Sequence, residues 1–258
     1  MAISRTICFL QAFLLFCCHY NLVRSQTRDT YEFSLENGWS SCSHTTNATV
    51  SFQNNVHLLL SDFNQQSSTK AFYNTSVGHN LDKVFGYYLC RGDVSLEVCN
   101  ECILNGTQSA AGFDCEFVDK SYTSGLCFFK YSNYNMYGLW PISITRIGFI
   151  EVNVTNYEQF NVTFTSLMEE LINEAAFESQ KNGSVLGFST NEASVTGDQT
   201  IYGLAQCTPD IVGVNCSLCL QDALSGLRGL AEGAPAAYSV DEKCYLRYDN
   251  VSFYNLGE

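Results

Sequence analysis

The chain has 258 residues, enough for one large domain or for two domains of about 110 residues each. Its 26 acidic and 13 basic side chains give a formal net charge of −13. A surface of this sign repels phosphate backbones and anionic lipid headgroups, which argues against nucleic-acid partners and against cationic disruption of membranes.

Residues 1–25 are predicted to form a secretory signal peptide. Arg5 supplies the positive start, an apolar run extends from Ile7 to Cys18, and Val23 and Ser25 stand at the −3 and −1 positions of a cleavage site. The apolar run is too short to span a membrane comfortably. Neither a later run of spanning length nor a lipid-attachment tail follows it. We therefore expect a secreted, extracellular protein with no membrane span.

Sequons for N-linked glycosylation agree with export. Eight asparagines begin N-x-S/T without an intervening proline, and we set Asn215 aside because its neighbour Cys216 is expected in a disulfide. The predicted glycosylation sites are Asn47, Asn74, Asn105, Asn153, Asn161, Asn182 and Asn250.

An internal repeat divides the rest of the chain into two copies. The spacing C-x8-C-x2-C occurs at Cys90, Cys99 and Cys102, and again 117 residues later at Cys207, Cys216 and Cys219. The same offset aligns Gly86 with Gly203, Asp93 with Asp210, and Cys127 with Cys244. We expect two homologous domains, at residues 30–140 and 146–258, joined by a short and stiff connection.

The first copy contains signals for helices and a strand. Apolar residues at helical spacing predict a helix near Asn55 to Phe63, and a second helix should begin at the C-x2-C pair and carry Ile103. The run from Gly125 to Tyr131 is rich in aromatic residues and predicts a strand.

The second copy repeats these signals. A clear apolar stripe predicts a helix from Phe164 to Phe177, and the C-x2-C pair should open another helix. Lys243 to Tyr248 predicts a strand. The expected fold class is α+β. It comprises two tandem domains, each an antiparallel β-sheet with two α-helices packed on one face and cross-linked by disulfides.

The cysteines are interpreted as structural. Removal of the signal peptide leaves ten of the thirteen, an even number that suits a disulfide framework in an exported chain. Oxidised cysteines cannot bind zinc as thiolates, so we expect neither a metal site nor a redox centre. Six cysteines in the first copy allow fifteen pairings from sequence alone.

These features together resemble a plant family. The C-x8-C-x2-C core, the Cys-aromatic-x-basic-Tyr ending and the tandem arrangement are similar to the ginkbilobin-homologous domain, also called the salt-stress-response/antifungal domain. Tandem copies behind a signal peptide look like the plant cysteine-rich repeat secretory proteins. The same pair of domains forms the ectodomains of cysteine-rich receptor-like kinases and of plasmodesmata-located proteins.

The resemblance implies a disulfide pattern. The implied pairs are Cys42–Cys115, Cys90–Cys99, Cys102–Cys127, Cys207–Cys216 and Cys219–Cys244. At the constant offset, the counterparts of Cys42 and Cys115 fall at about Gln159 and Glu232, and no cysteine lies near either. Because one whole bridge is missing, we expect the second copy alone to be the less stable one, unless its helix packing compensates.

Catalytic machinery is not recognisable. The three histidines beyond the signal peptide, His44, His57 and His79, stand in no metal-binding or nucleophile motif, and no Gly-rich phosphate loop is present. The paired acids Glu169 and Glu170 are expected on a solvated helix face. We therefore expect no enzymatic activity and no cofactor.

The resemblance also implies candidate sugar contacts, because one seed antifungal member of the family is a mannose-binding lectin. That lectin contacts its sugar through an asparagine, an arginine and a glutamate. In the first copy, Ser43 stands at the position of the asparagine and Ser132 at that of the glutamate, and the position of the arginine falls near Ser121 or Tyr122. In the second copy, Tyr238 stands at the arginine position and Asp249 at the glutamate position. Only Asp249 keeps a carboxylate that could make charge-assisted hydrogen bonds to a sugar.

Aromatic residues offer another route to carbohydrate, through stacking of sugars on rings. For strand aromatics next to cysteines, however, a role in the core is the favoured interpretation. The residues concerned are Tyr131, Tyr134, Tyr137, Trp140, Tyr248 and Tyr254.

The functional hypothesis is a secreted, non-enzymatic binding protein of the plant apoplast, whose ligand is a carbohydrate or an extracellular protein or receptor. A role in defence or stress response is implied by the resemblance. The alternatives are a mannose-binding antifungal lectin, and an ectodomain-like fragment of a cysteine-rich receptor-like kinase or plasmodesmata-located protein.

Overall fold

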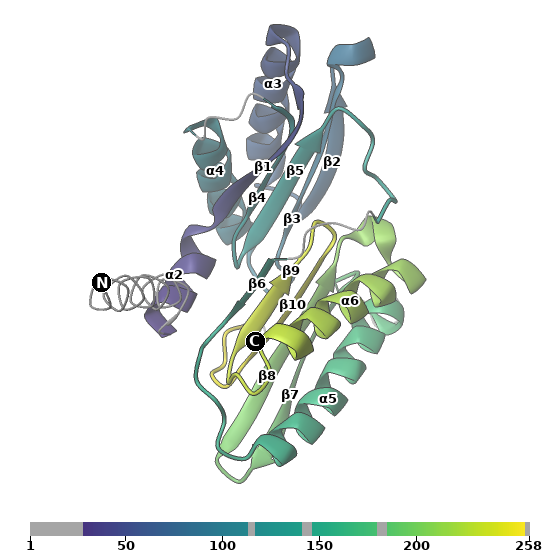
Figure 1. Cartoon of the computed structure of the whole chain (residues 1–258). Coiled ribbons are helices and arrows are strands. Elements are labelled where there is room, and N and C mark those ends of the chain that lie inside the picture. The colour runs from purple at the N-terminus through teal and green to yellow at the C-terminus, as the bar shows by residue number, and fades with distance from the viewer. Residues whose placement is uncertain (1–27, 113–116, 141–145, 180–184, 256–258) are drawn as a thin grey trace, which may run out of the picture.

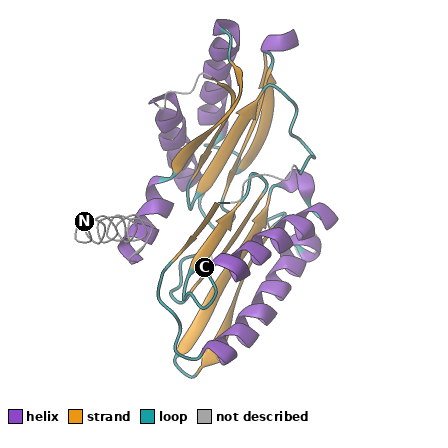
Figure 2. Cartoon of the chain, in the orientation of Figure 1, coloured by secondary structure: helices purple, strands orange, loops and turns teal. Residues whose placement is uncertain are grey.

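A computed structural model describes residues 28–112, 117–140, 146–179 and 185–255. These residues form two α+β bodies arranged one after the other along the chain, as Figure 1 shows. The expected signal peptide, Cys115 and Asn182 lie outside the described residues. The fold-class prediction of two tandem α+β domains is confirmed, and Figure 2 shows the helices and strands of each.

The first domain has a five-stranded sheet in the order β1-β4-β5-β3-β2, in which all neighbouring strands are antiparallel. Its strands are β1 (Trp39–Asn47), β2 (Phe72–Val77), β3 (Val84–Cys90), β4 (Phe117–Thr123) and β5 (Cys127–Ser132), and its helices are α3 (Val50–Gln66) and α4 (Leu96–Gly112). The hydroxyl of Thr49 accepts the Phe52 amide at 3.0 Å and caps α3, which begins at the next residue.

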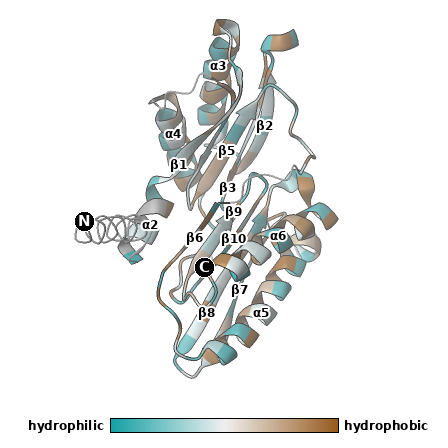
Figure 3. Cartoon of the chain, in the orientation of Figure 1, coloured by the Kyte–Doolittle hydropathy of each residue, from teal (hydrophilic) through white to brown (hydrophobic). Residues whose placement is uncertain are grey.

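The second domain repeats this topology in the order β6-β9-β10-β8-β7. Its strands are β6 (Arg146–Phe149), β7 (Phe188–Thr196), β8 (Gln199–Cys207), β9 (Ala237–Val240) and β10 (Cys244–Asp249). Helix α5 (Tyr157–Asn173) continues into a π-helical turn (Glu174–Glu178), and α6 (Val214–Leu230) begins beside Cys216. Both helices mix hydrophobic and hydrophilic residues along their length, as Figure 3 shows.

A glycine in the sheet faces helix α3 in the first domain and helix α5 in the second. A Cβ atom on Gly203 would lie 2.5 Å from Cδ1 of Leu171 in α5, and one on Gly86 would lie 2.8 Å from Cδ2 of Leu59 in α3. A larger residue at either position would displace these core side chains. The glycine shared by the two copies therefore leaves room for the core residues of the helix above it in both domains.

Disulfides fix the second helix of each domain to the central strands. The structure joins Cys90 to Cys99, Cys102 to Cys127, Cys207 to Cys216, and Cys219 to Cys244, which are four of the pairs implied by the family resemblance. Cys42 is also disulfide-bonded.

The predicted counterpart of Cys42 in the second copy was wrong. Cys42 lies opposite Lys120 in the β1–β4 ladder, and Phe149 lies opposite Ala237 in the β6–β9 ladder. Since Ala237 is Lys120 shifted by 117 residues, Phe149 occupies the place of Cys42, whereas Gln159 lies in α5. The constant offset fails before the central strands chiefly because the connection from α5 to β7, which contains the π-helical turn, is longer than the connection from α3 to β2. Phe149 packs against the domain core where the first domain has a cysteine.

The central strands β5 and β10 are buried along their whole length. In β10, Leu246 and Tyr248 face the core under the helices, whereas Tyr245 belongs to a separate cluster on the other face of the sheet. An antiparallel sheet often leaves one face in water. In this protein the helix-free faces are covered by the partner domain and by the additional helix α2 (Arg28–Asn37).

Candidate functional site

Charged side chains are buried where the two domains meet. The Lys130 ammonium group pairs with Glu242 of the second domain and lies 3.1 Å from Asp119. Burial lowers the pKa of Lys130, but the two carboxylates outweigh it, so its pKa is raised. For the carboxyl group of Glu242, burial has the opposite sign and raises the pKa, although the nearby Lys130 charge partly offsets this increase.

A second buried pair lies in the same interface. The Lys243 ammonium group donates to Asp210 at 2.7 Å, and both side chains are 1% exposed. It also lies 4.0 Å from the ring centre of Tyr87 in the first domain, whose hydroxyl donates to the Glu242 carbonyl. Burial lowers the pKa of Lys243, partly offset by Asp210. A buried charge of this kind is tolerated because it is paired and hydrogen-bonded.

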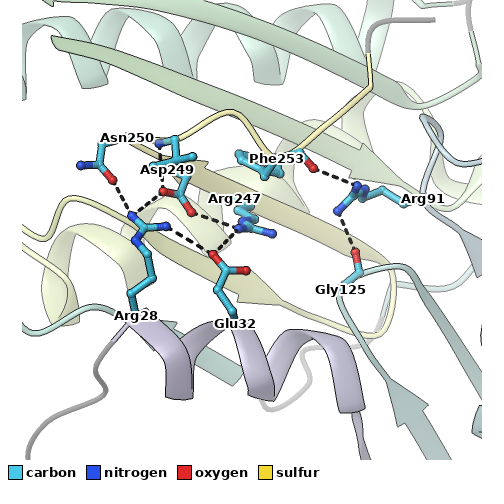
Figure 4. A network of polar contacts seen from close by, with 9 residues as sticks. Arg28, Glu32, Arg91, Gly125, Arg247, Asp249, Asn250 and Phe253 are labelled. Atoms are coloured by element: carbon cyan, nitrogen blue, oxygen red, sulfur yellow. Dashed lines mark hydrogen bonds and ion pairs between the residues drawn. The ribbon is translucent and has the colours of Figure 1, made fainter. Parts of the chain in front are cut away.

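Helix α2 adds a third set of ion pairs, drawn in Figure 4. Asp249 accepts hydrogen bonds from Arg28 at 2.9 Å and from Arg247 at 3.0 Å, and it also accepts the Val251 amide at 3.1 Å. The Arg247 guanidinium lies 3.9 Å from the ring centre of Phe253. Asp249 is therefore enclosed by protein donors.

The two domains hold each other reciprocally. The Gly138 amide, after the last strand of the first domain, donates to Asp210 at 2.8 Å, and the Asn255 amide of the second domain donates to Asp93 at 3.2 Å. The two donors, Gly138 and Asn255, are 117 residues apart, and so are the two acceptors, Asp93 and Asp210. The contact is thus made twice, in the manner of a pseudo-two-fold axis.

The first domain adds Arg91, which binds Asp93 at 2.6 Å and donates to the carbonyls of Gly125 and Phe253. The amide group of Gln206 donates to the Cys90 carbonyl at 3.1 Å. A cavity of about 20 Å³ lies beside these residues, which is far too small for a sugar. The interface accordingly joins the domains and offers no ligand site at this cavity.

The predicted sugar contacts do not converge on a surface site. Asp249 and Ser132 are 0% exposed and occupy equivalent positions in different domains, and Tyr238 is buried between Tyr31 and Trp39. Ser43 lies in β1 opposite Asp119. The burial of Asp249, Ser132 and Tyr238 argues against direct contact with a sugar.

The candidate aromatic residues divide between core and surface. Tyr131, Tyr248 and Tyr254 are buried, and Trp140 packs against the second core. Tyr134 and Tyr137 remain 44% and 55% exposed. The acids Glu169 and Glu170 lie on the exposed face of α5.

The helix-covered face of the second domain carries a groove and a cavity. A groove of about 470 Å³ lies between α5 and α6, and we call it the α5–α6 groove. Its lining combines an exposed ring with amides, hydroxyls and two charges; the residues are Glu169, Ile172, Asn173, Phe177, Ser217, Gln221, Leu224, Ser225 and Arg228. Sequence reasoning missed this groove, because its residues come from two helices about 50 residues apart in the chain.

A second hollow of about 310 Å³, which we call the Asn161 cavity, lies further along the same two helices. Buried rings of Phe160, Phe164 and Tyr248 line it, together with polar groups of Asn161, Arg228 and Glu232. The Tyr157 hydroxyl donates to Glu232 at 2.5 Å across it.

Six of the seven predicted glycosylation sites lie within the described residues, and all six are exposed.

Among the described residues, no group of three or more histidine, cysteine, aspartate or glutamate side chains is arranged to hold a metal ion. The same part of the chain has no helix that is long and apolar enough to cross a membrane.

Comparisons with known proteins agree with the tandem architecture. Residues 40–134 and 150–251 both match the family described as salt stress response/antifungal. The tandem DUF26 ectodomain of the Arabidopsis thaliana cysteine-rich receptor-like protein PDLP8 superposes with a TM-score of 0.71 at 24% identity, covering 83% of this chain and 98% of that one. At this identity the likeness establishes the fold.

Curated relatives include three proteins of Arabidopsis thaliana. Cysteine-rich repeat secretory protein 8 is 27% identical, over 79% of this chain and 74% of its own length. Putative cysteine-rich receptor-like protein kinase 9 is 31% identical, over 79% of this chain and 76% of its own length. Cysteine-rich receptor-like protein kinase 7 is 33% identical over 82% of this chain, but the match spans 32% of that kinase. With two matching domains and these relatives, the chain belongs to the salt stress response/antifungal family, as a tandem-domain member related to the cysteine-rich repeat secretory proteins.

Proposed function

We propose that the protein is an extracellular, non-catalytic binding protein of the plant apoplast that captures carbohydrate in the α5–α6 groove. The composition of this groove carries the proposal. It places the exposed ring of Phe177 beside the amides of Asn173 and Gln221 and the hydroxyls of Ser217 and Ser225. Sugars are bound by rings that stack on their apolar faces and by polar groups that meet their hydroxyls.

The position of the groove also supports this role. The helix-free faces of the two sheets are used in the interdomain interface, whereas α5 and α6 lie on the outward face of the second domain (Figure 1). A groove between two helices packed on a disulfide-linked sheet is held in a fixed shape. A preformed site loses less conformational entropy when it binds.

Family membership supports the location and the biological setting. Relatives are named as secretory proteins and as receptor-like kinases. The family description supports a role in stress or antifungal defence. A second candidate function, recognition of an extracellular protein in the manner of a receptor ectodomain, is favoured by the match to the tandem ectodomain of a receptor-like protein.

A glycan array tests the proposal. The oxidised protein, secreted by a eukaryotic host, would be applied to plant and fungal cell-wall glycans, and each hit would be titrated against variants. We expect Phe177→Ala and Gln221→Ala to weaken binding about tenfold each, which corresponds to the loss of one ring or hydrogen-bond contact.

The matched control is Tyr137→Ala, which removes an exposed ring outside the groove. It should bind as the wild type does. A blank array from folded protein, or hits that both groove variants leave unchanged, would refute carbohydrate binding in the groove and favour a protein partner.

A further inference from the structure

We propose that the Asn161 cavity holds the first N-acetylglucosamine of a glycan attached to Asn161, and that this sugar stabilises the second domain. The proposal goes beyond the binding role of the α5–α6 groove and does not depend on it. Three observations carry it: a sequon at the mouth of the cavity, an aromatic floor, and a polar rim that joins α5 to the turn after α6.

The sequon is placed to deliver a sugar into the cavity. Asn161 is exposed on α5 and is itself one of the lining residues. Tyr157 and Thr165, four residues before and after it, line the same hollow, because residues four apart share one face of a helix. The volume of about 310 Å³ is at the lower end of the range of small-molecule sites, which suits a single sugar ring.

The lining matches the two kinds of surface on a pyranose. Phe160 and Phe164 are about 5% exposed, and the ring centre of Phe164 lies 4.8 Å from that of Tyr248, so the floor is aromatic and apolar. The rim is polar, with the Arg228 guanidinium donating to Thr165 at 3.3 Å and Tyr157 donating to Glu232. The apolar face of a sugar would pack on the floor while its hydroxyls meet the rim.

The cavity also lies between two separate segments of the second domain. Glu232, in the turn after α6, accepts a hydrogen bond from Tyr157 at the start of α5. A sugar held between α5 and the Ala231–Gly233 turn would add contacts between these two segments. The glycan would therefore stabilise the second domain where α5 meets this turn.

Attachment uses the ordinary chemistry of the secretory route. A bond forms between Nδ2 of Asn161 and C1 of the sugar, and the bond from C1 to the pyrophosphate of a lipid-linked oligosaccharide donor breaks. The amide gives up one proton, and the lipid pyrophosphate leaves. The sequon Asn161-Val162-Thr163 supplies the acceptor.

The test compares three glycan states of the full chain. The protein is secreted by a host that adds high-mannose glycans, and glycopeptide mass spectrometry measures occupancy of Asn161. One sample is trimmed by an endoglycosidase that leaves a single N-acetylglucosamine. Thr163→Val abolishes the sequon without touching a lining residue. We expect the trimmed protein to keep its Tm within about 1 °C of the untreated protein and Thr163→Val to melt about 2–4 °C lower.

Ser76→Ala is the matched control, because it removes the exposed sequon of Asn74 on β2, which is not among the residues lining the Asn161 cavity. Its Tm should not change. The proposal is overturned if Asn161 carries no glycan, if the trimmed protein melts as low as Thr163→Val, or if Ser76→Ala lowers the Tm as much as Thr163→Val does.

Discussion

Replacing Asp249 should destabilise the fold far more than replacing its partner Arg28. The side chain of Asp249 is 1% exposed and neutralises Arg247, whose side chain is 4% exposed. Asp249→Asn leaves that buried guanidinium paired with the partly exposed Glu32 at 3.6 Å and without its buried counter-charge, which costs about 3–5 kcal/mol. The side chain of Arg28 is 36% exposed, so water screens its ion pair, and Arg28→Gln should cost at most about 1 kcal/mol.

Urea unfolding of the oxidised protein, followed by intrinsic fluorescence, measures both changes through the midpoint at a common m value. The double variant Arg247→Met, Asp249→Leu removes the pair instead of orphaning one member. Buried ion pairs replaced by apolar residues are often close to neutral, so it should recover most of the loss.

Equal and small effects of Asp249→Asn and Arg28→Gln would refute this reasoning, since they would mean that Arg247 does not need its buried partner. The stability of the double variant is a second test of the same reasoning. If the double variant is no more stable than Asp249→Asn, the loss comes from packing and not from an orphaned charge.

Two further predictions concern the interdomain interface. Tyr31→Ala should lower the free energy of unfolding by about 3–5 kcal/mol, because Tyr31 is 0% exposed and packs on Tyr238. Hydrogen-exchange protection in β9 and β10 should fall as well. An equal effect of the exposed control Tyr137→Ala would contradict this prediction. Burial raises the pKa of Tyr31, Tyr87 and Tyr245 above the ordinary value of 10.0, so their contribution to stability is complete below about pH 10 and is lost as the pH rises. Tyrosinate absorbance of these residues should therefore appear together with unfolding, and their titration near pH 10 in the folded protein would refute it.

Local sequence signals were sufficient for the repeated architecture. The cysteine spacing and the 117-residue offset located the central strands, and the apolar stripe from Phe164 onward located α5. These signals succeed because they depend on neighbours within one domain. The offset failed at Gln159, because an insertion between α5 and β8 shifts everything before it.

The interface could not be predicted in the same way. Helix α2 has the weak apolar pair Tyr31 and Leu35 at helical spacing, but the surface that it covers lies about 200 residues later in the chain. Arg247 and Asp249 alternate with Leu246 and Tyr248, a pattern that normally places the charged face in water. The charges are buried because another part of the molecule covers that face, and a strand pattern contains no information about such a cover.

Differences between the two copies explain how the interface became specific. The aspartates at 93 and 210 are shared, and they accept the reciprocal contacts from Asn255 and Gly138. Other interface residues differ: Ser132 stands at the position of Asp249, so the first domain lacks a carboxylate where Asp249 accepts a hydrogen bond from Arg28. A dimer of identical chains must repeat every substitution on both sides, whereas a tandem chain can change one side alone. The asymmetric ion pairs therefore favour one arrangement of the two domains, which leaves the helix-covered faces, and with them the proposed α5–α6 groove, pointing outward.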